Sequence, residues 1–177
     1  MNRSTYDINI NAAEHLIPIC PGKLISKKKS KFPQNIFDTL DKNAKNNDDY
    51  QNLQSIAYRY QVDIPIPVYC LGVTIGEYEI IPDTEMPKRI TTFVPKTSVE
   101  YFTDDLNDAT ECLSAAVQFF ERTFDCPLPS HCHKLIFVKG PPSIDNFASA
   151  PYCSMTILST DHLHPKSMNV LNNDSNL

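Results

Sequence analysis

Residues 58–66 read YRYQVDIPI, and this stretch decides the first element of the fold. Apolar and aromatic side chains alternate here with polar ones, which is the period-2 pattern of a strand that is buried on one face. Pro65 has no amide donor, so we expect this end of the strand to lie at an edge or a bend. Further short strands are expected at 69–75, 78–81 and 90–94. Together these runs predict the last strands of an antiparallel sheet over residues 57–95.

Helical spacing replaces this alternation after Pro95. Apolar residues recur every three or four positions from Leu106 to Phe124, which predicts an amphipathic helix over residues 103–124. Thr103 is the expected N-cap, and the carboxylates that follow it suit the positive first turn of a helix. Two short buried strands are expected after the helix, at 134–138 and 153–159.

The order of these elements predicts a mixed α/β (α+β) fold. We expect the end of an antiparallel β-sandwich domain over residues 57–95, followed by the start of a second domain, a β-α-β segment, over 96–165. The boundary is expected near Pro95 to Ser98, and residues 166–177 are expected to form a loose, Asn-rich tail. Neither domain looks complete, so we interpret the chain as a fragment.

The first part of the chain, residues 1–56, is expected to be mostly disordered. Its stretch 26–31 is dominated by lysine and its stretch 42–49 is almost wholly polar, so neither can bury enough apolar surface to offset chain entropy. The lysine run has two interpretations, a nuclear address or local nucleic-acid contact and an ordinary solvated loop. The residues concerned are Lys27, Lys28, Lys29 and Lys31.

Composition excludes several classes of protein. The net charge of −5 over 177 residues is too acidic for a protein that coats DNA. No apolar run approaches the roughly 18 residues of a membrane-spanning helix, and the N-terminus lacks a secretory signal, so we expect a soluble intracellular chain. The six cysteines are therefore expected to be free thiols.

Motifs of metal and hydrolytic chemistry are weak or missing. Histidines and cysteines gather late in the chain, but their spacing does not match the paired knuckles of structural zinc sites, and no metal site is expected. They are Cys126, His131, Cys132, His133, His162 and His164. The sequence contains no H-E dipeptide and no G-x-S-x-G, whereas a Cys–His dyad stays open. Acidic residues at 104–111 are read as helix N-terminal charges, with an acid/base or cation site as the alternative.

Three stretches carry a resemblance to a known family. Residues 71–80 read LGVTIGEYEI, residues 119–124 read FFERTF before a Cys-Pro turn, and residues 150–164 read APYCSMTILSTDHLH. In this order they resemble the zinc aminopeptidases with the G-A-M-E-N exopeptidase motif. More closely, they are similar to the catalytically dead relatives of that family, the aminopeptidase-like TBP-associated factors that form subunit 2 of the general transcription factor TFIID. The resemblance covers 58–164 and implies that the second domain is the start of a thermolysin-like domain.

The exopeptidase motif of that family falls on residues 153–157. The five matching positions hold Cys153, Ser154, Met155, Thr156 and Ile157. In the active enzymes the motif's Glu helps to hold the α-ammonium of the substrate, a charge-assisted contact. Thr156 has no charge for that role, so the motif is read as degenerate. The missing H-E-x-x-H is weaker support, because in the enzymes the zinc helix follows this strand and the present sequence stops first.

The resemblance implies a non-enzymatic structural subunit, or a fragment of one. Its expected partners are other TFIID subunits and, through the whole assembly, core-promoter DNA; its expected location is the nucleus, with no cofactor, small-molecule substrate or membrane. The lysine run would contact phosphates and not bases. Two alternatives stay open, a truncated piece of a zinc metallo-aminopeptidase and a small free-standing interaction module.

Overall fold

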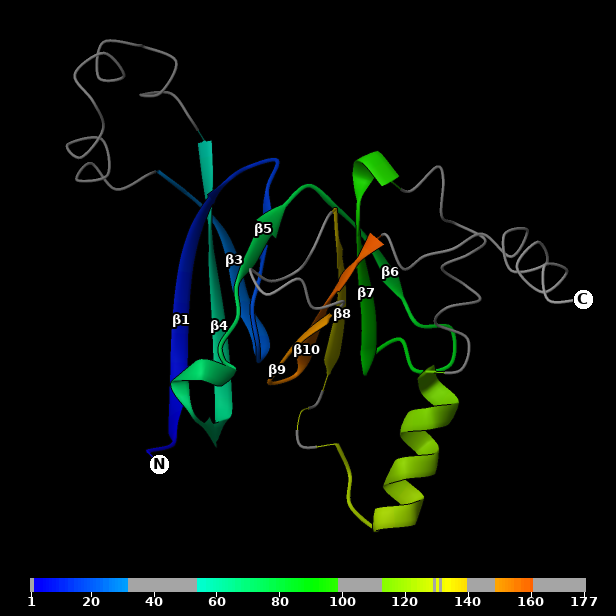
Figure 1. The fold of residues 1–177 in the computed structure, drawn as a ribbon. Coiled ribbons are helices and arrows are strands. Elements are labelled where there is room, and N and C mark those ends of the chain that lie inside the picture. The colour runs from blue at the N-terminus through cyan, green and yellow to red at the C-terminus, as the bar shows by residue number, and fades with distance from the viewer. Residues whose placement is uncertain are drawn as a thin grey trace, which may run out of the picture.

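The computed structural model describes residues 2–31, 54–98, 113–128, 130, 132–139 and 149–160. Within these residues the strands form a three-stranded, a five-stranded and a two-stranded sheet (Figure 1). One helix, over residues 113–124, accompanies them. The expected mixed α+β class is therefore confirmed.

The three-stranded sheet is built around β4 (Gln54–Ile66), which contains the stretch quoted at the outset. β4 lies between β1 (Ser4–Ala13) and β3 (Lys23–Lys31) and is antiparallel to both. The expected alternation is confirmed, because the side chains of Tyr58, Tyr60 and Val62 are buried while those between them are exposed. Pro65 lies beyond Gln61, the last residue of β4 that pairs with β3, so its missing amide costs no hydrogen bond on that side.

The prediction of disorder over residues 1–56 is wrong for the described part of that segment. β1 and β3 are both strands, and order in β4 already begins at Gln54. β3 is polar because it lies at the edge of the sheet, where β4 supplies the backbone partners and most of its side chains face solvent. The polar stretch 42–49 lies outside the described residues.

A small ribbon connects the two larger sheets. After β4 the chain forms a short 3-10 helix, η1 (Val68–Cys70), and then β5 (Thr74–Gly76), which pairs with β2 (Ile17–Ile19). Ile19 is buried in the core of the five-stranded sheet, and the next residue, Cys20, is buried in the core of the three-stranded sheet. The two cores therefore meet at the end of β2.

The five-stranded sheet has the order β6-β7-β8-β10-β9. Its three central strands are parallel, and an antiparallel strand closes each edge. The strands are β6 (Tyr78–Pro82), β7 (Ile90–Pro95), β8 (His133–Val138), β9 (Ser149–Tyr152) and β10 (Met155–Ser159). A second 3-10 turn, η2 (Lys96–Ser98), follows β7.

The predicted domain boundary near Pro95–Ser98 divides strands that belong to one sheet. β7 lies before this boundary and β8 after it, yet the two pair in parallel from Ile90↔His133 to Phe93↔Ile136. Parallel neighbours need a long crossover connection, and the helix lies in that connection. The change of sequence pattern at Pro95 therefore marks the start of a crossover and not the end of a domain.

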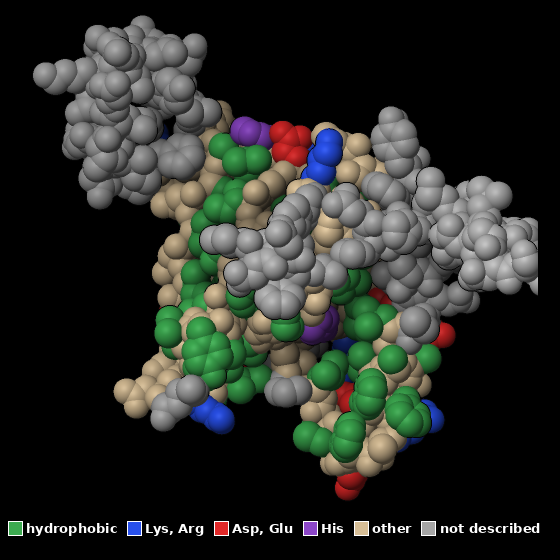
Figure 2. Space-filling model, viewed as in Figure 1, with side chains coloured by type: hydrophobic (Ala, Val, Ile, Leu, Met, Phe, Trp, Pro, Cys, Tyr) green, Lys and Arg blue, Asp and Glu red, His purple; other side chains and the backbone are tan. Residues whose placement is uncertain are grey.

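The helix is described from residue 113, and the expected first turns from Thr103 to Cys112 lie outside the described residues. Its aromatic side chains are exposed among the described residues, at 61% for Phe119, 54% for Phe120 and 70% for Phe124. Figure 2 shows hydrophobic side chains gathered on this helix. The aromatic part of the expected apolar stripe is therefore exposed in the C-terminal half of the helix. No described helix is long and apolar enough to cross a membrane.

Candidate functional site

The residues expected to form the degenerate exopeptidase motif make the turn and the start of the second strand of a hairpin. Cys153 and Ser154 make the turn between β9 and β10, where a strand over 153–159 had been expected, and Ser154 has a φ of 56°. The Gly22 amide donates a 3.0 Å hydrogen bond to Ser154 Oγ, which ties this turn to the N-terminal part of the chain. Met155 and Ile157 point into the core of the five-stranded sheet. Four of the five motif residues thus serve the turn or the core.

Thr156, the fourth motif residue, points to the other face of the sheet. Its Oγ1 lies 3.1 Å from Nε2 of His133, on the neighbouring strand β8. Burial lowers the pKa of His133, which favours the neutral imidazole. The pair is therefore a hydroxyl and an uncharged ring. It offers no negative charge to an ammonium group of a substrate.

The lysines at 27–31 lie along β3, at the edge of the three-stranded sheet. Residues that face each other across antiparallel strands share a face, and Lys27 faces Tyr58, Lys29 faces Ile56 and Lys31 faces Gln54. Lys28 faces Ala57 and therefore lies on the opposite face. The four ammonium groups do not form a single-faced patch.

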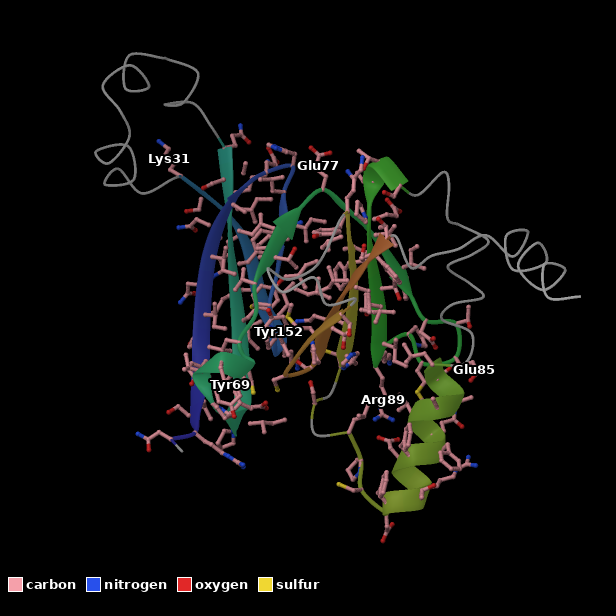
Figure 3. The ribbon with its side chains drawn as sticks, viewed as in Figure 1. Lys31, Tyr69, Glu77, Glu85, Arg89 and Tyr152 are labelled. Carbon is pink, nitrogen blue, oxygen red and sulfur yellow. The ribbon has the colours of Figure 1, made fainter. Side chains whose placement is uncertain are left out.

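Two of these lysines already have partners. Lys27 Nζ lies 5.5 Å from the centroid of the Tyr58 ring, and Lys29 Nζ lies 3.1 Å from Glu14 Oε1 in an exposed ion pair. An exposed pair of this kind contributes little to stability and is available for exchange with a phosphate. Within the described residues, Lys28 and Lys31 have no ion pair, and Figure 3 shows Lys31 at the end of its strand.

Lys134 is a buried residue that sequence reasoning missed. Its Nζ donates to the carbonyl oxygens of Cys20 at 2.5 Å and Gly22 at 2.6 Å, and lies 4.8 Å from the centroid of the Tyr60 ring. Burial lowers its pKa, because desolvation penalises the ammonium. The signal in the sequence was a single cation inside the apolar run of β8, which has no surface role to explain it.

An ion pair fixes the end of the helix to the β6–β7 connection. Arg89 Nη1 donates to Glu121 Oε2 at 2.9 Å, and the Leu128 amide donates to Glu121 Oε1 at 2.8 Å. Figure 3 shows Arg89 beside the helix. The hydrogen bonds from Arg89 and Leu128 lower the pKa of Glu121 to about 2. This contact positions the helix. Because Arg89 and Glu121 are paired with each other, neither charge is free to take part in catalysis.

The metal-type residues do not come together where the structure describes them. Among the described ranges, no group of three or more His, Cys, Asp or Glu side chains is arranged to hold a metal ion. Of the histidines and cysteines considered above, His131, His162 and His164 lie outside these ranges, as do the acidic residues at 104–111.

Comparison with known proteins identifies the fold of the chain and nothing finer. No family model matches the chain, and no curated protein matches its sequence. Among solved structures, aminopeptidase A of Legionella pneumophila, crystallised with aspartic acid, is similar with a TM-score of 0.56 and 17% identity. The chain has an aminopeptidase-like fold. The match covers 88% of this chain and 16% of that chain, so the present sequence spans a small part of the larger protein.

The aminopeptidase-like fold agrees with the resemblance at the level of architecture. The resemblance had assigned the exopeptidase motif to residues 153–157, which form the β9–β10 turn and the start of β10. The contact between Thr156 and His133 could not be foreseen, because their pairing depends on the register of β8 and β10.

Proposed function

We propose that the chain is part of a non-enzymatic subunit of TFIID, in which an aminopeptidase-like fold serves as a scaffold for transcription initiation by RNA polymerase II. The observation that carries the proposal is the environment of Thr156. Its hydroxyl bonds to a neutral imidazole, at the position where the exopeptidase motif has a carboxylate. A site of this kind lacks the charge that holds the amino terminus of a peptide.

The remaining motif positions support a structural role. Met155 and Ile157 pack with Ile136 in the core, and Ser154 is held by the Gly22 amide. Side chains used in this way rigidify the hairpin instead of lining a binding site. The resemblance of residues 150–164 to the aminopeptidase-like TBP-associated factors supplies the proposed partners, which are other TFIID subunits, and the proposed location, the nucleus.

Association with the TATA-binding protein tests this proposal. The protein that contains this chain would be tagged at its own locus, purified from nuclei at moderate salt, and analysed by quantitative mass spectrometry against an untagged control. We expect TBP and several TBP-associated factors to be enriched together. A protein that purifies without TBP and without any TBP-associated factor would contradict the proposal.

DNA contact through β3 is the second part of the proposal. Lys28 and Lys31 are available, and the exposed pair of Lys29 exchanges easily, so this strand would act through phosphates. We would replace Lys27, Lys28, Lys29 and Lys31 by Gln and plot the logarithm of the promoter-binding constant against the logarithm of the salt concentration. The slope is expected to become shallower by up to about 0.9 for each phosphate contact that is lost. The matched control replaces four exposed cations elsewhere, Lys88, Lys96, Lys139 and Arg122. Equal slopes in both variants would remove DNA contact from the proposal.

The alternative is a piece of a metallo-aminopeptidase, and the structural match to an aminopeptidase favours it. The two proposals differ in the coding sequence that follows Leu177. A continuing frame that lacks H-E-x-x-H supports the scaffold, whereas a frame that carries H-E-x-x-H and a downstream Glu ligand supports the peptidase.

A further inference from the structure

Two cysteines from distant parts of the chain meet where η1 approaches the β9–β10 turn. The Cys153 amide donates a 3.0 Å hydrogen bond to the carbonyl oxygen of Cys70. This bond brings the backbones of the two cysteines into direct contact, and a disulfide requires its two residues to lie close together.

The segments that carry the two cysteines are held together closely. A Cβ placed on Gly72 would lie 2.7 Å from the Tyr152 ring, so the chain after η1 packs directly against the residue before Cys153. Figure 3 labels Tyr69 and Tyr152, the residues that precede the two cysteines, on η1 and at the hairpin. The backbone segments that carry the two thiols are therefore held against each other.

Both side chains are thiols in this structure and both are half-buried. The Cys70 thiol lies near enough to raise the pKa of Cys153, in addition to the larger effect of burial. Partial exposure gives a small reagent access to the pair, whereas Cys20 is fully buried. Among the described cysteines, Cys126 is exposed and provides a comparison for reactivity without such a neighbour.

We propose that Cys70 and Cys153 form a dithiol site that a low-molecular-weight disulfide, such as oxidised glutathione, converts to an internal disulfide. One cysteine, as thiolate, attacks a sulfur of glutathione disulfide and expels one glutathione thiolate. The second cysteine then attacks the protein sulfur of this mixed disulfide and expels the other. The two protein thiols are oxidised, glutathione disulfide is reduced to two thiols, and the two cysteine protons pass to the two glutathione thiolates.

The bridge would join the end of the β4–η1 segment to the hairpin of the five-stranded sheet. It would close a loop that contains residues 71–152, which restricts the unfolded ensemble. The oxidised form is therefore expected to melt at a higher temperature than the reduced form. Exchange is expected to accelerate as the pH rises, because only the thiolate attacks.

Peptide mapping of the full chain tests the proposal. The chain would be equilibrated in buffers of increasing oxidised-to-reduced glutathione ratio, alkylated, and digested with trypsin without reduction. We expect a linked pair of peptides, residues 60–88 and 140–166, each containing one cysteine of the pair. The intact chain should lose the mass of two hydrogens and regain it on reduction.

Variants separate this pair from general thiol oxidation. Cys70→Ser and Cys153→Ser should each abolish the linked peptides and the rise in melting temperature, whereas Cys126→Ser should leave both unchanged. Circular dichroism of each reduced variant verifies that it is folded. The proposal is overturned if folded wild-type chain gives only glutathione adducts, or if Cys70 or Cys153 links to another cysteine instead.

Discussion

The ammonium of Lys134 lies 4.8 Å from the centre of the Tyr60 ring, although the two residues belong to different sheets. Lys134 is on β8 of the five-stranded sheet, and Tyr60 is on β4 of the three-stranded sheet. The same ammonium donates to the carbonyl oxygens of Cys20 and Gly22, just after β2. One buried cation therefore connects both sheets with the segment that joins them.

Replacing Lys134 by Met tests this connection. The change keeps much of the side-chain volume but removes the ammonium donor from the buried carbonyl of Cys20 and the part-buried carbonyl of Gly22, so we expect a loss of about 2–3 kcal/mol in the free energy of unfolding. Urea titration followed by circular dichroism measures it. Lys28→Met, on the exposed edge of β3, is the control and should change the value by less than about 0.5 kcal/mol. Equal effects would show that Lys134 does not hold the sheets together.

Gly22 is the point where the turn after β2 closely approaches β4. It has a φ of +85°, and a Cβ there would overlap the backbone carbonyl of Gln61 on β4. Gly22→Ala is therefore expected to destabilise the fold by about 2 kcal/mol or more. Gly76→Ala, whose nearest neighbours would be side-chain atoms of Tyr78, is expected to cost less than about 1 kcal/mol. If the two variants had the same denaturant midpoint, the strained turn after β2 would not matter for stability.

The Arg89–Glu121 pair predicts a specific acid dependence. The pKa of Glu121 falls from 4.5 to about 2, so the folded state binds this proton less tightly than the unfolded state. The stabilising contribution is complete above pH 4.5 and is lost as the pH falls toward about 2. The melting temperatures of wild type and Glu121→Gln should therefore differ most above pH 4.5 and converge below it. Glu79→Gln, at an exposed position, serves as the control, and a gap that widens in acid would be inconsistent with this ion pair.

The lowered pKa of His133 predicts a second pH dependence of stability, below pH 6.5. Its pKa is lowered by burial from 6.5, so protonation favours the unfolded state, and stability should fall as the pH drops below 6.5. His133→Gln keeps a polar group near Thr156 but does not titrate. The difference in unfolding free energy, wild type minus variant, is expected to decrease between neutral pH and mildly acidic pH. A constant difference across pH 6.5 would mean that His133 titrates as it does in the unfolded chain.

Sequence patterns correctly predicted the elements whose structure depends mainly on their own residues. The alternation of Tyr58, Tyr60 and Val62 identified β4, because one face of that strand is buried and the other is not. The lysines of β3 were misread as disordered because an edge strand receives its order from the partner strand, and that partner lies beyond residues 32–53 in the sequence.

The contacts that build the candidate site are long-range and lay beyond such patterns. Lys134 finds its two carbonyl partners 112 and 114 residues away, and the hydroxyl of Thr156 meets His133 only in the observed register. The assignment of the exopeptidase motif to residues 153–157 rests on the residue match at 150–164, since no periodicity marks it, and it stays a prediction.

We propose that this aminopeptidase-like fold acts as a scaffold and not as a peptidase. The most direct measurement is the rate at which the whole protein, purified from its native source, releases amino acids from aminoacyl substrates with zinc present. Because the proposed exopeptidase position holds the uncharged Thr156–His133 pair, we expect no release above that of a matched blank. Zinc-dependent release that a chelator abolishes, and that co-purifies with the chain, would contradict the account.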